Sequence, residues 1–179
     1  MVYIHLAQGF EEVEALTCVD LLRRVGIETY MVSMTGEEIV KSVRGVGIQS
    51  DLLFEEADYN SCDMIVLPGG MPGAKNLGDH CELVQQIVRF AETGKWIAAI
   101  CAAPMVFGHN RLLEGKKATI FPGMEEHLIG AKCSNDRVVI DGNVITSKGP
   151  GTAMEFALAI VGVLKGTEAS DKLRNDLVL

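Results

Sequence analysis

The sequence lacks the features of several protein classes, beginning with paired cysteines and long apolar runs. Its five cysteines are an odd number and none are spaced as CxxC, which argues against a disulfide framework and a zinc ribbon. The longest apolar run near the N-terminus covers only residues 2–7 and follows no basic segment. We therefore expect no signal peptide and no membrane-spanning helix, and we expect a cytoplasmic protein with reduced thiols.

Basic residues and prolines are also few. The 16 Lys and Arg are outnumbered by 24 Asp and Glu, giving a net charge of −8, which argues against a nucleic acid or an anionic membrane as partner. Only five residues are proline while 48% are hydrophobic, so the chain can form a packed core. A length of 179 residues is typical of one domain, which we expect to cover residues 1–179.

The four histidines show neither HxxxH nor HExxH spacing, so we expect no metal site. His5 lies inside a predicted strand and is expected in the core. His80 and His109 fall at the start and the end of predicted helices, and His127 in a predicted surface helix. None of them is assigned to catalysis.

Short apolar stretches alternate with helical patterns along the chain. The predicted strands cover residues 2–7, 28–34, 62–67 and 97–100, with strand and turn material at 37–49. The predicted helices cover residues 11–25, 81–92, 102–109, 152–164 and 168–174. Strands at 138–140 and 144–146 flank an Asp-Gly-Asn turn, which is typical of a hairpin. We predict a three-layer α/β/α sandwich with a mainly parallel sheet and an added β-hairpin.

Thr152 and Glu155 have capping-box spacing at the start of the fourth predicted helix.

Ligands of open parallel sheets bind outside the carboxyl ends of the strands. The residues that follow Ala7, Leu67 and Ile100 are therefore the places to search for a site.

Cys101 joins a strand directly to a helix, a junction that requires a sharp turn and small neighbours. Ala99 and Ala103 lie two residues on either side of it, and Pro104 falls in the first helical turn. A helix N-terminus at this position should favour the thiolate and lower the pKa of Cys101. The alternative interpretation is a buried structural cysteine.

Glu14 lies on the apolar stripe of the first predicted helix, together with Cys18, Leu21, Leu22 and Val25. A carboxylate there is costly unless it is paired or protonated, and burial raises its pKa. A neutral Glu14 could donate a hydrogen bond to a thiolate, or a charged one could act as a base. The alternative is a residue at the mouth of a groove, bonded to a backbone amide.

The turn after Leu67 contains two glycines, so backbone amides there can face a ligand. We predict an oxyanion-binding site formed by the amides of Gly70 and Ala102. A phosphate or dinucleotide site is disfavoured because GGMPG does not match GxGxxG and no P-loop lysine follows. A simple tight turn is the remaining alternative.

Four stretches taken together, GFEEVE, LPGG, AAICAAP and SKGPGTAMEFALAIV, resemble the ThiJ/PfpI superfamily in the branch of the Parkinson-disease protein and bacterial YajL. The resemblance extends over nearly the whole chain. It implies a flavodoxin-like fold, a homodimer, a reactive Cys101 and a protonated Glu14. It also implies that Arg44 approaches the site across the dimer and that Arg24 is its neighbour, whereas the residues alone indicate two solvated basic side chains.

The resemblance implies a cofactor-independent glyoxalase or deglycase acting on methylglyoxal or glyoxal and on their adducts with protein or nucleotide groups. The alternatives are an oxidative-stress sensor or a redox-regulated chaperone, and last an amidohydrolase or protease. Some relatives carry a histidine where this chain has Phe121, so a Cys-His-acid triad is disfavoured and a Cys–Glu pair is the better hypothesis.

Overall fold

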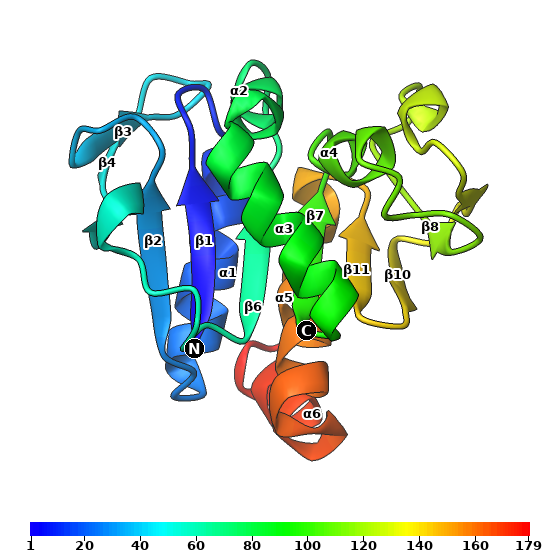
Figure 1. Ribbon diagram of the computed structural model, residues 1–179. Coiled ribbons are helices and arrows are strands. Elements are labelled where there is room, and N and C mark those ends of the chain that lie inside the picture. The colour runs from blue at the N-terminus through cyan, green and yellow to red at the C-terminus, as the bar shows by residue number, and fades with distance from the viewer.

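Seven strands form one sheet in the computed structural model, which describes residues 1–179 (Figure 1). Their order is β10-β11-β7-β6-β1-β2-β5. The strands cover Val2–Leu6 (β1), Thr29–Ser33 (β2), Leu52–Leu53 (β5), Met64–Leu67 (β6), Trp96–Ile100 (β7), Val138–Asp141 (β10) and Val144–Ser147 (β11). All neighbours are parallel except β10, which pairs with β11 as an antiparallel hairpin. The mainly parallel sheet and its hairpin were both predicted.

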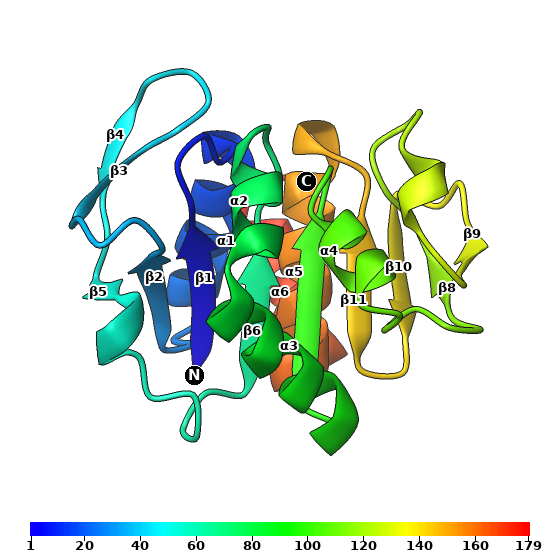
Figure 2. The same cartoon turned by 45° about the horizontal axis from the view of Figure 1, so that its top comes forward.

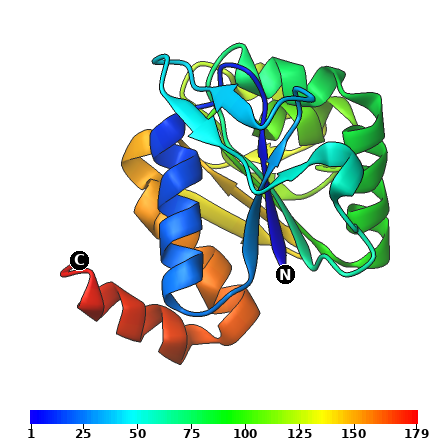
Figure 3. The same cartoon turned by 90° about the vertical axis from the view of Figure 1, so that its left-hand side faces the viewer.

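Helices cover both faces of this sheet, as Figure 3 shows from one edge. Blue α1 and orange-red α5 and α6 lie on one side, and green α2, α3 and α4 on the other. The helices cover Glu12–Arg24 (α1), Gly73–Asp79 (α2), Cys81–Thr93 (α3), Pro104–His109 (α4), Ala153–Lys165 (α5) and Thr167–Asp176 (α6). The three-layer sandwich predicted from the sequence is confirmed. No helix combines the length and the apolar character needed to cross a bilayer.

The inner strand β1 is buried on both faces, because each face of the sheet packs against helices. Val2, Ile4 and Leu6 belong to the hydrophobic cluster shared with α1 and α5. Tyr3 and Ala7 point the other way, into the cluster shared with α2, α3 and α4. This alternation follows from the two-residue period of a strand.

Two small strand pairs lie outside the main sheet. The predicted strand and turn region at 37–49 is the antiparallel pair β3 (Ile39–Lys41) and β4 (Gly47–Gln49), beside the upper end of β1 (Figure 2). The second pair, β8 (Lys117–Ala118) and β9 (Lys132–Cys133), was not predicted. Three 3-10 helices complete the chain: η1 (Phe54–Glu56), η2 (Glu125–His127) and η3 (Pro150–Thr152).

Two local predictions about helix starts were wrong. Helix α4 begins at Pro104 rather than at residue 102, because residues 101–103 form a turn. Helix α5 begins at Ala153 near the expected place, but the capping box with Glu155 does not form. The Thr152 hydroxyl instead bonds the carbonyl of Gly149, and the carboxylate of Glu155 accepts hydrogen bonds from Arg137.

Candidate active site

The site lies at the carboxyl edge of the sheet, where the loops after β1, β6, β7 and β11 meet at the top of Figure 1. Parallel neighbours bring these loops together although they are far apart in the sequence. Backbone hydrogen bonds join them: Glu11 donates to the carbonyl of Gly69 at 2.9 Å, and Cys101 donates to the carbonyl of Ser147 at 2.9 Å.

Cys101 occupies the sharp turn that the sequence predicts. Its φ is 62°, a left-handed conformation that residues other than glycine seldom adopt. Hydrogen bonds hold the turn, since Ala103 donates to the carbonyl of Ile100 at 3.0 Å and Phe121 donates to that of Cys101 at 2.9 Å. The residue is partly exposed. A strained backbone therefore places this thiol at the surface of the site.

Glu14 comes from the first turn of α1 and is completely buried. Its Oε2 accepts a hydrogen bond from the amide of Gly69 at 2.7 Å, while Oε1 has no hydrogen-bond partner. Glu11 caps the helix by accepting the amide of Glu14 at 2.8 Å, so the backbone at this point is fixed. An unpartnered carboxyl oxygen in a buried position is costly unless a proton or a ligand satisfies it.

Gly69 separates the thiol from the carboxyl, a role that the sequence analysis missed. A Cβ at this position would lie 2.5 Å from Cys101 Cβ and 2.8 Å from Glu14 Oε2. Only glycine therefore lets the two side chains approach each other. The double glycine after Leu67 was the available signal, but it was assigned to Gly70 alone.

The backbone amides of Gly70 and Ala102 lie near the Cys101 sulfur and act to lower the pKa of its thiol. Gly70 has a φ of 84°, and a Cβ there would lie 2.6 Å from the backbone nitrogen of Glu11, so this position needs glycine for both reasons. The same two amides are the ones that the sequence predicts as an oxyanion site, and both act on the Cys101 thiol.

The pKa values of the two facing acids are coupled. Burial raises the pKa of Glu14 to about 7, although the amide of Gly69 and the thiol of Cys101 oppose this rise. Burial also raises the pKa of Cys101 to about 12, and the negative charge of Glu14 adds to the rise. The amides of Gly70 and Ala102 lower it by less. The expectation of a lowered pKa for Cys101 was therefore wrong.

Two features explain that error. Helix α4 has only six residues and starts three residues after Cys101, so its dipole acts weakly on the sulfur. The buried carboxyl of Glu14 opposes a second negative charge beside it. A thiolate at Cys101 is therefore favoured only when Glu14 holds the proton.

Comparison with known proteins identifies the family of this chain. The model of the DJ-1/PfpI family matches residues 1–162. The chain belongs to the DJ-1/PfpI family. The predicted superfamily and flavodoxin-like fold are thereby confirmed.

Several members of the DJ-1/PfpI family match over nearly their whole length. Protein dj-1beta of Drosophila melanogaster is 40% identical over 97% of this chain and 94% of its own. The "glutathione-independent glyoxalase DJR-1.2" of Caenorhabditis elegans is 36% identical over 94% of this chain and 90% of its own. The structure of oxidized DJ-1 from Toxoplasma gondii has a TM-score of 0.94 and 36% identity, covering 99% of this chain and 97% of that one.

Other family members are longer. The chain spans 38% and 44% of the length of the DJ-1 homologs B and A of Arabidopsis thaliana, to which it is 42% and 40% identical.

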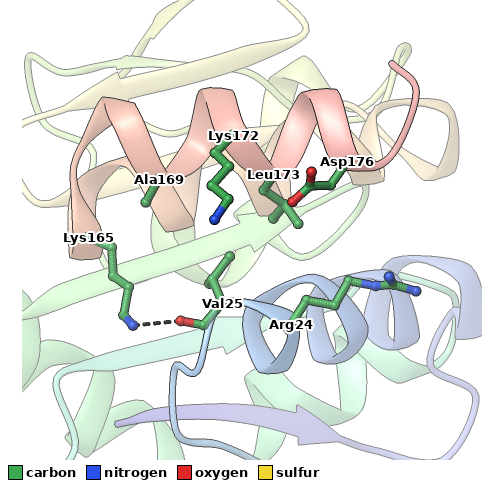
Figure 4. A pocket seen from close by; sticks show the side chains of 7 residues that line it. All are labelled: Arg24, Val25, Lys165, Ala169, Lys172, Leu173 and Asp176. Carbon is green, nitrogen blue, oxygen red and sulfur yellow. Dashed lines mark hydrogen bonds between the residues drawn. The ribbon is translucent and has the colours of Figure 1, made fainter.

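The two arginines that the DJ-1/PfpI resemblance selects lie apart. Arg44 is exposed at the tip of the β3–β4 hairpin, whose Val43 donates to the carbonyl of Phe10 at 2.7 Å. Arg24 ends α1, about 15 Å along the helix from Glu14 at 1.5 Å per residue. Arg24 instead pairs with Asp20 and lines a cavity of about 420 Å³ between α1 and α6 (Figure 4). Within this chain, neither arginine is brought to Cys101.

The histidines lie away from the Cys101 sulfur. His5 is buried against the Tyr59 hydroxyl at 2.7 Å, and His80 caps α3, both as expected. His109 at the end of α4 and His127 in η2 bond each other at 3.1 Å. A catalytic Cys-His pair is therefore not formed.

Proposed function

We propose that this chain is a cofactor-independent glyoxalase that converts an α-oxoaldehyde such as methylglyoxal or glyoxal into a 2-hydroxy acid. The same chemistry would act on the early adducts of these aldehydes with protein or nucleotide groups, which makes the enzyme a deglycase. The observation that carries the proposal is the Cys101 turn, with the buried carboxyl of Glu14 beside it and two backbone amides near the sulfur. The glyoxalase name of the C. elegans relative supports it.

The first step joins the sulfur to the aldehyde carbon. The reactive form of the pair has the proton on Glu14 and the negative charge on Cys101, which is an internal proton transfer from thiol to carboxylate. The thiolate forms the C–S bond, and the electron pair of the C=O bond moves to oxygen. The amides of Gly70 and Ala102 would stabilise this oxyanion, which then takes the proton from Glu14 to give a hemithioacetal and leaves Glu14 as a carboxylate.

The second step moves hydrogen between two carbons of the adduct. The carboxylate of Glu14 removes the proton from the former aldehyde carbon and returns a proton to the adjacent carbon. The proton on the first oxygen moves to the second oxygen, so a thioester with a 2-hydroxyl group results. The aldehyde carbon is oxidised and the ketone carbon is reduced by two electrons, and no external redox partner is required.

Water completes the reaction by hydrolysing the thioester. Its oxygen adds to the carbonyl carbon, the C–S bond breaks, and the 2-hydroxy acid leaves while Cys101 is regenerated. For methylglyoxal the sum is one aldehyde plus one water giving lactate and a proton.

Lactate formation from methylglyoxal tests this proposal. We expect Cys101→Ser to abolish turnover and Glu14→Gln to reduce kcat by about 10²- to 10⁴-fold, the usual contribution of a general acid–base group. Cys133→Ser is the matched control, because Cys133 is an exposed thiol in β9. Wild-type rates for Cys101→Ser would show that another group is the nucleophile.

A second candidate function is redox sensing, or a chaperone activity regulated by it, at the same residue. The amides that face the sulfur would also stabilise the oxygens of a sulfinate formed with two equivalents of peroxide. Mass spectrometry after mild peroxide treatment should then find two added oxygens on Cys101 before the exposed Cys81 and Cys133. Equal oxidation of these three thiols would contradict the sensor.

We also propose a homodimer in which Arg44 of the partner subunit approaches the substrate. Support comes from the exposure of Arg44 at a hairpin tip, where it forms no ion pair within its own chain. Sedimentation should give twice the monomer mass, and Arg44→Ala should raise KM without changing that mass.

A further inference from the structure

An aromatic ring and a glycine lie beside the Cys101 sulfur. A Cβ built on Gly149 would lie 3.3 Å from Phe121 Cδ2, 3.6 Å from Phe121 Cε2 and 4.0 Å from Cys101 Sγ. One point in space is therefore in van der Waals contact with the ring and within 4.0 Å of the sulfur. The side of the sulfur that faces Gly149 therefore also lies near the ring of Phe121.

We propose that Phe121 and Gly149 form the subsite for the substituent of the α-oxoaldehyde, and that they select an apolar, preferably aromatic, substituent. This inference rests on the proposed function, because it takes Cys101 as the group that attacks the aldehyde carbon. It assigns a substrate class: aldehydes with an alkyl or aryl substituent, such as phenylglyoxal, are favoured over glyoxal, which has none.

The ring is fixed from the side of the turn. The amide of Phe121 donates to the carbonyl of Cys101 at 2.9 Å, and its carbonyl accepts from Met124 at 3.1 Å. The side chain nevertheless remains 44% exposed, although it is large and apolar. A bound substituent would remove part of this apolar surface from water, which is favourable.

Gly149 provides space rather than an unusual backbone conformation. Its φ of 163° is extended and accessible to any residue. The Thr152 hydroxyl fixes the position by donating to the Gly149 carbonyl at 2.9 Å and accepting from its amide at 3.1 Å. An added methyl group would therefore lie against the ring and 4.0 Å from the sulfur, and would narrow the space on this side of the sulfur.

The chemistry of this subsite sets the direction of the preference. A phenyl ring has no hydrogen-bonding group, so a hydroxyl or phosphate on the substituent would lose water without gaining a partner there. An aromatic substituent gains a ring contact beyond the burial of its surface. We expect this contact to favour phenylglyoxal about three- to tenfold in kcat/KM over a substrate that cannot make it.

The first test compares kcat/KM for phenylglyoxal and for glyoxal. Phe121→Leu should lower the phenylglyoxal:glyoxal ratio about three- to tenfold, and Gly149→Ala should lower it further while glyoxal is still accepted. Phe54→Leu is the matched control, because Phe54 packs against Tyr59 and His80. An unchanged ratio in both subsite variants would overturn the inference.

A second measurement does not depend on turnover. The rates of Cys101 alkylation by phenacyl bromide and by bromoacetone are followed by intact-protein mass spectrometry and divided by the rates with free glutathione. The corrected ratio should favour phenacyl bromide in the wild type and fall toward one in Phe121→Leu. An equal ratio in both proteins overturns the subsite. A falling ratio without lactate formation keeps the subsite and rejects the glyoxalase function.

Discussion

Glu14 should make the stability of the protein decrease as the pH rises. The perturbation that isolates this effect is Glu14→Gln, which keeps the size of the side chain and an oxygen that can accept from the Gly69 amide. The variant has no charge to bury at this position. The difference in unfolding free energy between wild type and variant therefore reports the cost of ionising Glu14.

The size of the effect follows from the two pKa values. The carboxyl has its ordinary pKa of 4.5 in the unfolded chain and a pKa of about 7 in the folded protein. Below pH 4.5 it is protonated in both states, so ionisation costs nothing. Between pH 4.5 and 7 the folded state keeps a proton that the unfolded state has released, so stability falls as the pH rises. At about 1.4 kcal/mol per pH unit, the loss reaches about 3 kcal/mol by pH 8.

Urea unfolding at pH 4.5, 6 and 8 provides the measurement. The stability of wild type minus that of Glu14→Gln should fall by about 3 kcal/mol across this range, with equal m values in the two proteins. Other titrating groups contribute equally to both proteins and cancel in the difference. A difference that stays constant, or that grows with pH, would refute the raised pKa and with it the protonated Glu14 of the proposed mechanism.

Three further substitutions test other parts of the structure. Burial lowers the pKa of His5 from 6.5 to about 3. The unfolded chain therefore binds a proton that the folded protein does not, and stability is lost as the pH falls below 6.5. His5→Gln removes this loss and should lower the pH of the acid-unfolding midpoint measured by circular dichroism. Gly108→Ala would place a methyl 2.0 Å from the carbonyl oxygen of His127 and should cost at least about 2 kcal/mol in urea unfolding. If the proposed reaction occurs at Cys101, Gly69→Ala should reduce lactate formation more than tenfold, because its methyl would displace the Glu14 carboxyl from Cys101. Unchanged values would contradict each argument.

The sheet was predictable because its strands carry their own signal. Residues 64–67 are apolar without interruption and residues 2–6 are interrupted only by His5, as expected for strands covered on both faces. Helix α3 was predicted to within one residue, since Gly94 at its end adopts the left-handed conformation that stops a helix. An apolar run indicates a buried strand and a glycine indicates the end of a helix, so both features can be predicted from the sequence.

Helix α2 was not predicted for a reason that is equally local. Its seven residues, Gly73–Asp79, include two glycines and follow a proline, a composition typical of a loop. Tertiary contacts decide otherwise: the amide of Gly73 donates to the carbonyl of Gly9 at 3.2 Å, and Ala74 and Leu77 are fully buried. A Cβ on Gly73 would lie 2.6 Å from the backbone nitrogen of Phe10. The glycine that weakens the helix signal is required by the packing.

The same limit applies to the chemistry of the site. The pattern of the first helix was sufficient to place Glu14 on a buried face and to expect a raised pKa. The pKa of Cys101 could not be obtained in this way, because its direction depends on the charge of a side chain 87 positions earlier in the sequence, at a distance that Gly69 sets. A sequence pattern indicates whether a side chain is buried or exposed. The effect of a distant residue's charge on its pKa becomes known only from the three-dimensional structure.

Two glycines thus shape the site because they have no side chain. Gly69 lets the thiol and the carboxyl approach, and Gly149 has no side chain that would lie against the ring of Phe121. Neither needs a left-handed backbone, so alanine could adopt both conformations and would fail only by occupying space. Alanine at 69 should remove activity toward every aldehyde, whereas alanine at 149 should remove it selectively for aldehydes with large substituents. The two variants therefore separate the reacting pair from the selectivity of the site.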